Sequence, residues 1–155
     1  MNATIEVKQL PEMNLAAVSF TGPQQTANAY GTIMQWAAPR GFLNENTKMV
    51  TIYHDSFKVT QPDRIRMSAC ILLDQPVEGS GEVVPKTITP NNCIVGRFEI
   101  GMNEYEKAWT GLFAWMKENG YTKADMDPFE IYHNNPNEHP KGIAIVDFCV
   151  PIRSS

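Results

Sequence analysis

The sequence lacks several patterns that would identify a chemistry. Its three cysteines include no C-x-x-C pair, which argues against a disulfide framework and against a zinc site. It contains no G-x-S-x-G motif, no H-E-x-x-H motif and no phosphate-binding glycine loop. Nucleophilic and phosphoryl-transfer catalysis therefore have no support, and we expect neither a bound metal nor a cofactor.

Strong charge and long apolar runs are also missing. The net charge is -4 without a basic stripe, which argues against direct binding of nucleic acid. No apolar run approaches the length of a membrane span, and the start "MNATIEVKQL" has no signal-peptide h-region. We expect a cytoplasmic protein that does not enter the membrane.

The sequence does contain an internal repeat with a constant offset. Ile-Tyr-His followed by Asp or Asn occurs at 52–55 and again at 131–134. The same offset aligns, without a gap, the pairs Gly22 and Gly101, Ala29 and Ala108, Trp36 and Trp115, Gly41 and Gly120, and Cys70 and Cys149. This pattern predicts a tandem duplication, with copies at about 1–75 and 85–155 joined by "QPVEGSGEVVP". A chain of 155 residues can bury one good core, so we expect a single domain over 1–155.

Each copy reads as a strand, a helix and two further strands. In the first copy these are "LAAVSFTG", "GPQQTANAYGTIMQWAAPRG", "MVTIYH" and "IRMSACILL". In the second copy Asn103 and Glu106 predict a capping box, Gly120 closes the helix, and "PFEIYH" and "GIAIVDFCVPI" are strands. The segment "TIEVKQL" is expected as an additional edge strand. This order predicts an α+β domain with helices on one face of a mostly antiparallel sheet.

Strand alternation separates apolar from polar side chains in both copies. Phe129 and Ile131 point to one face of their strand, and Glu130 and Tyr132 point to the other. In the closing strand, Asp147 takes the polar side. We expect the polar face to be the one that the helices leave uncovered, with a ligand groove where the two half-sheets meet.

The duplicated unit resembles a known family. Its order of elements, together with "PFEIYHNNP" followed by "DFCVPI" and the "IYHD" of the first copy, is similar to the GyrI-like small-molecule binding domain of AraC-type and MerR-type regulators. The resemblance covers essentially the whole chain. It implies a site for lipophilic, often cationic compounds, anchored by a glutamate that matches Glu130.

The predicted ligand-binding residues are Glu130, Tyr132, Tyr53, Trp109 and Asp147. A carboxylate among aromatic rings favours a bulky cation, because a low dielectric strengthens Coulomb attraction and ring faces add a cation-π contribution. The competing interpretation of Glu130 is a solvated strand carboxylate. For the helical pair Trp36 and Trp115 we expect structural packing.

Two other functions stay open at this point. The family resemblance implies inhibition of DNA gyrase by protein contact, as its stand-alone member does, or hydrolysis of reactive ring compounds with Glu130 as general base. A regulator of this family places a helix-turn-helix ahead of the domain, whereas this sequence starts almost directly at the first strand. We therefore expect either a stand-alone binding module or a domain of a longer regulator, and Met1 favours the former.

Overall fold

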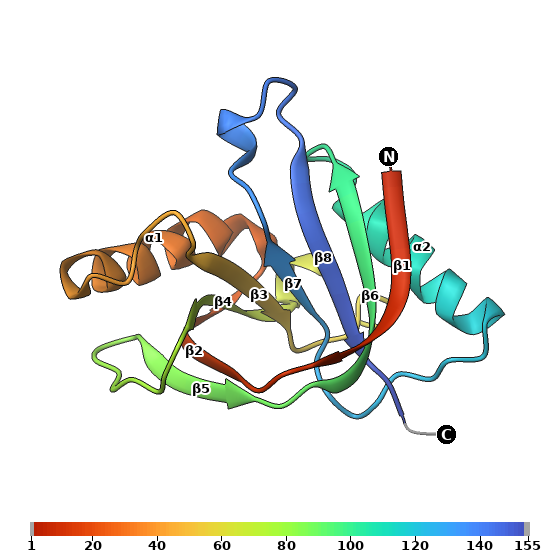
Figure 1. Cartoon of the computed structure of the whole chain (residues 1–155), viewed down its shortest axis with the longest axis horizontal. Helices are drawn as coiled ribbons and strands as arrows, with labels where there is room; N and C mark the ends of the chain where they lie inside the picture. Colours follow the sequence, from red (N-terminus) through yellow and green to blue (C-terminus); the bar gives the residue numbers. More distant parts are fainter. Residues whose placement is uncertain (1, 154–155) are drawn as a thin grey trace. The chain divides into compact units, whose positions relative to one another are not determined.

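The computed structural model describes residues 2–153, and the chain divides into two compact units. Unit 1 is formed by the first eleven residues and by those from Pro90 onward, and unit 2 spans Glu12–Thr89. Within the described range each unit contains four antiparallel strands and one α-helix (Figure 1). The fold is α+β with mostly antiparallel strands, as the sequence predicts.

Unit 1 has the strand order β1-β6-β8-β7, and every neighbouring pair is antiparallel. Its elements are β1 (Asn2–Leu10), β6 (Asn91–Ile100), α2 (Tyr105–Glu118), β7 (Phe129–Tyr132), the short 3-10 helix η4 (Pro136–Glu138) and β8 (Ala144–Pro151).

Unit 2 has the corresponding order β5-β2-β4-β3, again with antiparallel neighbours. Its elements are β2 (Met13–Thr21), α1 (Thr26–Ala37), β3 (Lys48–Tyr53), β4 (Arg66–Leu73), β5 (Val84–Ile88) and three 3-10 helices, η1 (Pro23–Gln25), η2 (Ala38–Arg40) and η3 (Pro62–Arg64).

The terminal strands of the two units differ from the sequence prediction. The predicted edge strand is confirmed as β1, but it pairs with β6, which comes from the second half of the chain. Strand β5 was missed, and it pairs with β2 of the first half. Pro85 lies inside β5, and proline argues against a strand on sequence grounds because it cannot donate to the ladder. A strand at the end of a sheet tolerates proline, because the backbone groups on its outer edge have no neighbouring strand with which to form hydrogen bonds.

The helix ends follow the predicted signals in part. Gly41 and Gly120 both adopt the left-handed conformation, with φ of 76° and 78°, just after the helical segments they close. The predicted capping box at Asn103 and Glu106 is wrong. The residue before α2 is Glu104, and its Oε1 instead accepts a hydrogen bond from the Gly101 backbone N–H at 2.8 Å.

The two units have matching element orders, with one local difference in spacing. The first residues of α1 and α2, Thr26 and Tyr105, are related by the same offset as the sequence repeat. The strands before the helices are spaced differently. Ser68 and Asp147 are equivalent in the repeat, and their partners in the neighbouring strands are Ser19 and Arg97. The repeat offset would instead match Ser19 to Phe98, one residue further along the chain. One residue is therefore added between β6 and α2. The duplication itself stays a prediction.

Helix α2 packs on the unit 1 sheet at Gly96. A Cβ atom at Gly96 would lie 3.0 Å from Leu112 Cδ1 of α2 and 2.6 Å from Phe98 Cε1. Leu112 is fully buried, and Phe98 contacts Phe148 of β8 in an edge-to-face arrangement at 5.2 Å. The missing side chain of Gly96 thus lets the helix approach the sheet closely.

We predict that Gly96→Ala lowers the free energy of unfolding by about 1–3 kcal/mol, because the added methyl group overpacks the contact between α2 and the sheet. Gly111→Ala is the matched control, since a Cβ atom there meets nothing within 4 Å. In the helix interior that change is expected to stabilise by about 0.5–1 kcal/mol. Urea denaturation of both variants checks this, and equal effects would contradict the packing described.

Candidate functional site

Glu130 lies on the side of the unit 1 sheet that α2 covers. Its register partner in β8 is Phe148, and paired residues of antiparallel strands point to the same face. The Phe148 ring packs against Trp109 of α2, with ring centroids 4.8 Å apart. The prediction that Glu130 and Tyr132 occupy the uncovered face is therefore wrong, although the alternation that separates them from Phe129 was predicted correctly.

Two aromatic side chains donate hydrogen bonds to the Glu130 carboxylate. Trp109 Nε1 donates to Oε2 at 2.7 Å, and the Tyr132 hydroxyl donates to Oε1 at 2.5 Å. Glu130 is only 1% exposed. Removing a carboxylate from water is costly, and hydrogen bonds to both oxygens offset part of that cost. Glu130 is thus a buried, oriented carboxylate and not the solvated strand residue of the competing interpretation.

Aromatic rings surround this carboxylate on the α2 side. Phe148 contacts Tyr105 at 5.9 Å between centroids, in addition to Trp109 and Phe98. Burial, followed by the nearby charge of Glu130, raises the pKa of Tyr105 to about 12. A phenol that stays protonated beside a carboxylate provides an apolar ring face without adding negative charge.

Unit 2 carries an uncharged counterpart of the same contact. The Tyr30 hydroxyl of α1 lies 2.6 Å from Thr51 Oγ1 of β3, and Thr51 is 1% exposed. The repeat offset matches Tyr30 to Trp109 and Thr51 to Glu130. The helix-to-strand contact is therefore present in both units, but only the unit 1 contact carries a carboxylate.

The other predicted residue from unit 2, Tyr53, lies at the end of β3. Its ring packs edge-to-face on Phe57 at 5.0 Å. Tyr53 and Phe57 both belong to unit 2, whereas Glu130 belongs to unit 1. The predicted role of Tyr53 as a wall of the ligand site therefore stays a prediction.

Asp147 lies on the face of unit 1 opposite Glu130, because its register partner in β7 is Ile131. The prediction that it shares a face with Glu130 is wrong. Its carboxylate accepts a hydrogen bond from Arg97 Nε at 2.8 Å and contacts His133 Nε2 at 2.8 Å. Burial alone would raise the pKa of Asp147, but the contacts with His133 and Arg97 outweigh it and lower the pKa to about 2.

The structure also identifies partners that sequence reasoning missed. Tyr105 belongs to the same helical stripe as Trp109, four residues away, and that spacing could have placed both beside Glu130. Arg97 gave no signal, because its proximity to Asp147 depends on the register between β6 and β8. Trp36 packs as expected and is 7% exposed, while Trp115 stacks on Tyr121 at 5.7 Å.

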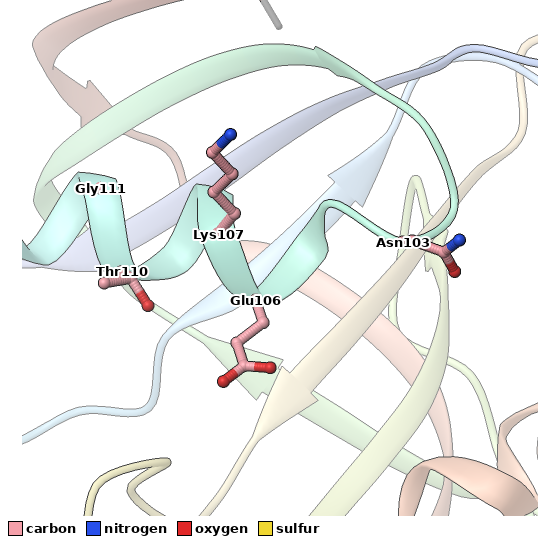
Figure 2. A pocket seen from close by; sticks show the side chains of 5 residues that line it. All are labelled: Asn103, Glu106, Lys107, Thr110 and Gly111. Carbon is pink, nitrogen blue, oxygen red and sulfur yellow. The ribbon is translucent and has the colours of Figure 1, made fainter.

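An open hollow of about 470 Å³ lies on the outer face of α2. It is lined by Asn103, Glu106, Lys107, Thr110 and Gly111, and Figure 2 shows the side chains of the first four extending in different directions from the helix and the preceding turn. Binding sites place a few polar groups so that they converge on a ligand, and these do not. Glu130 is not among them, so the hollow is separate from the buried carboxylate, and the predicted groove between the half-sheets stays a prediction.

Among residues 2–153 no group of three or more His, Cys, Asp or Glu side chains is placed to hold a metal ion. Cys70, Cys93 and Cys149 are free and buried, and burial raises the pKa of Cys70 and of Cys93 to about 12. None of the described helices is long and apolar enough to cross a membrane.

The chain belongs to the GyrI-like small molecule binding domain family, whose model matches residues 3–153. This membership defines the class of the protein as a small-molecule binding domain. No curated protein matches the chain.

Solved structures share the fold at low identity. The C-terminal domain of EcmrR is 16% identical, with a TM-score of 0.79 and full coverage of both chains. EcmrR bound to DNA has a TM-score of 0.83 at 16% identity, over 99% of this chain and 58% of that one, so this chain spans little more than half of the EcmrR chain. A hydrolase from Listeria innocua is 13% identical, with a TM-score of 0.63, over 96% of this chain and 91% of that one.

We predict that Trp109→Phe lowers the free energy of unfolding by about 2 kcal/mol more than Trp36→Phe does, because a hydrogen bond to a charged acceptor contributes about 1.5–3 kcal/mol. Both indoles are buried, but Trp36 Nε1 has no hydrogen-bond partner within residues 2–153. The Trp36 variant therefore controls for the smaller ring. Equal losses in urea denaturation would show that the Trp109 hydrogen bond contributes nothing to stability.

The Asp147 contacts predict a pH dependence of stability. Because the pKa of Asp147 is lower in the folded state than its ordinary 3.8, its stabilising contribution is complete above about pH 4 and is lost as the pH falls toward 2. Asp147→Asn should be less stable than the wild type at pH 7, and this difference should shrink by about 1 kcal/mol at pH 3. Urea denaturation at both pH values measures it. A difference that is constant with pH would contradict the assignment.

Proposed function

We propose that this chain binds lipophilic organic cations, with the Glu130 carboxylate as the anchor and Trp109, Tyr132 and Tyr105 as the surrounding aromatic surface. The observation that carries the proposal is the buried carboxylate itself, 1% exposed and hydrogen-bonded by two aromatic donors. Family membership supports a small-molecule ligand in general. The charge and the rings support its chemical class.

A cation is favoured over a neutral compound for electrostatic reasons. Surrounding protein of low dielectric strengthens the attraction between the carboxylate and a positive charge, and ring faces attract the same charge. A large cation with a diffuse charge, such as a phosphonium or a quaternary ammonium, sheds its water easily enough to enter an apolar site. Consistent with this class, a structure of the same fold, SAV2435, was solved bound to tetraphenylphosphonium; it is 10% identical, with a TM-score of 0.58, over 97% of this chain and 94% of that one.

Binding requires the buried carboxylate of Glu130 to become accessible to the ligand. Trp109 is on α2 and donates to Glu130 Oε2, so the ligand reaches the carboxylate by displacing this indole, by moving α2 outward, or by both. The cation then replaces an aromatic donor as the partner of the carboxylate. Opening costs part of the binding free energy, which reduces the observed affinity but selects against ligands without a positive charge.

The role of such binding is proposed from the fold neighbours. The chain matches the complete C-terminal domain of EcmrR, and EcmrR itself is described in complex with DNA. We propose an effector-binding role, in which occupancy by the cation changes the position of α2. Inhibition of gyrase stays a prediction from the family resemblance.

Hydrolysis by Glu130 is the weaker alternative. A general base must reach a water molecule with a free lone pair. Each oxygen of Glu130 keeps a second lone pair beside the hydrogen bond from Trp109 or Tyr132, but the residue is 1% exposed, so solvent does not reach these lone pairs in this structure. The geometry therefore favours binding over catalysis.

Isothermal titration calorimetry with tetraphenylphosphonium and with neutral triphenylphosphine oxide tests the proposal. The wild type should bind the cation more tightly than the oxide, and Glu130→Gln should weaken cation binding about tenfold or more while changing oxide binding by less than about threefold. Glu106→Gln is the matched control, because it removes one carboxylate from the outer face of α2.

Two results would overturn the proposal. One is cation binding that is unchanged in Glu130→Gln. The other is a loss of binding in Glu106→Gln alone, which would move the site to the outer hollow.

A further inference from the structure

Strand β1 ends the unit 1 sheet and is exposed along its length. Its hydrogen-bonded neighbour within the described residues is β6, and the strand order of the unit begins with it (Figure 1). It is nine residues long, from Asn2 to Leu10. The side chains from Ala3 to Leu10 are exposed or half-buried, and Val7 is 46% exposed. The outer edge of this strand is a row of backbone donors and acceptors available for another strand.

Most of the usual protections of an edge strand are missing from β1. Natural edges are blocked by proline, by bulges, by short length or by charged side chains, and of these devices β1 carries the charged side chains Glu6 and Lys8. Strand β1 contains neither proline nor glycine, and its register with β6 runs without interruption from Asn2 to Leu10. Strand β5 of unit 2 provides a contrast, since it is five residues long and contains Pro85. The sequence therefore protects the outer edge of β5 by short length and proline, and does not protect β1 in this way.

The charges of β1 are arranged in a self-complementary way. Glu6 and Lys8 lie two residues apart on the same face and form an ion pair at 3.3 Å. When two copies of β1 pair antiparallel with Val7 opposite Val7, each Glu6 lies opposite the other copy's Lys8. Each strand keeps its own ion pair between Glu6 and Lys8, and two further ion pairs form between the strands. The four side chains then make a ring of alternating charge. The same register places Ile5 opposite Gln9 and Thr4 opposite Leu10.

We propose that β1 is a dimerisation edge, on which a second copy of this chain pairs antiparallel about Val7. The partner is another copy because the edge complements itself: one register satisfies the backbone, both charges and the exposed valine together. Such an interface is isologous, with the same residues contributed by each copy. The continuous ladder joins the two unit 1 sheets. This inference is independent of the ligand proposed for Glu130.

The expected interface is small, so the dimer is weak. One shared strand edge buries less surface than a standard protein interface, and complexes of that size dissociate at micromolar or higher concentrations. Dimers should form at high protein concentration and dissociate on dilution, and added salt should weaken them because the charges remain near water.

Sedimentation velocity with charge-reversed variants tests the register. Wild-type protein at a concentration of about 0.5 mM should sediment largely as a dimer of the 17.4 kDa chain. Glu6→Lys alone and Lys8→Glu alone each place like charges opposite one another, so each should weaken self-association about tenfold or more. An equimolar mixture of the two variants restores opposite charges at every position and should form a heterodimer about as stable as the wild-type dimer.

Glu118→Lys is the control for net charge, because it makes the same charge change as Glu6→Lys but at the exposed end of α2. It should leave dimerisation unchanged. Circular dichroism spectra of all variants should match that of the wild type, since the substituted side chains are exposed. The proposal is overturned when the wild type stays monomeric at about 0.5 mM. Unchanged dimerisation of both single variants, or a mixture that stays monomeric, would equally overturn it and indicate another surface or another partner.

Discussion

The buried carboxylate of Glu130 is the constraint on which the unit 1 architecture depends. A charge that is 1% exposed persists in a folded protein only where its hydrogen bonds are supplied, and Trp109 and Tyr132 supply them from α2 and from β7 itself. The helix must therefore hold one indole nitrogen over one strand position. The close approach of α2 at Gly96 and the rings around Phe148 make that position available.

The same constraint links stability to recognition. The interaction that fixes α2 on the sheet uses the carboxylate that a cation would bind, so ligand and helix compete for one group. In unit 2 the equivalent contact joins Tyr30 and Thr51, which carry no charge. A lost neutral hydrogen bond is cheaper to tolerate and offers nothing to a cation. The charge present in unit 1 and absent from unit 2 agrees with the proposal that the Glu130 contact binds a ligand and the Tyr30 contact is structural.

Sequence patterns predicted much of the fold. Helical spacing and closing glycines located both helices, and alternation separated Glu130 from Phe129. The side of the sheet was predicted wrongly, because alternation divides a strand into two sets of residues without saying which set a helix covers. Polar side chains were assumed to face solvent, but Glu130, Thr51 and Asp147 are all buried, and Glu130 accepts hydrogen bonds from two aromatic donors. Alternation also does not fix the register between two strands, so side-chain pairs across strands could not be predicted. The contact of Arg97 with Asp147 is the clearest case.

The most direct test of this account follows the three indole N–H signals in ¹H–¹⁵N NMR spectra during titration with tetraphenylphosphonium, with the Trp109 signal assigned from Trp109→Phe. The Trp109 signal should move furthest and saturably, because the cation takes over the carboxylate that the Trp109 N–H now contacts. The signal of Trp36, whose nitrogen has no such partner in the described part of the chain, should move little. In Glu130→Gln the shift of Trp109 should vanish. A Trp109 signal that stays fixed while the cation binds would contradict the central claim that Glu130 anchors the ligand.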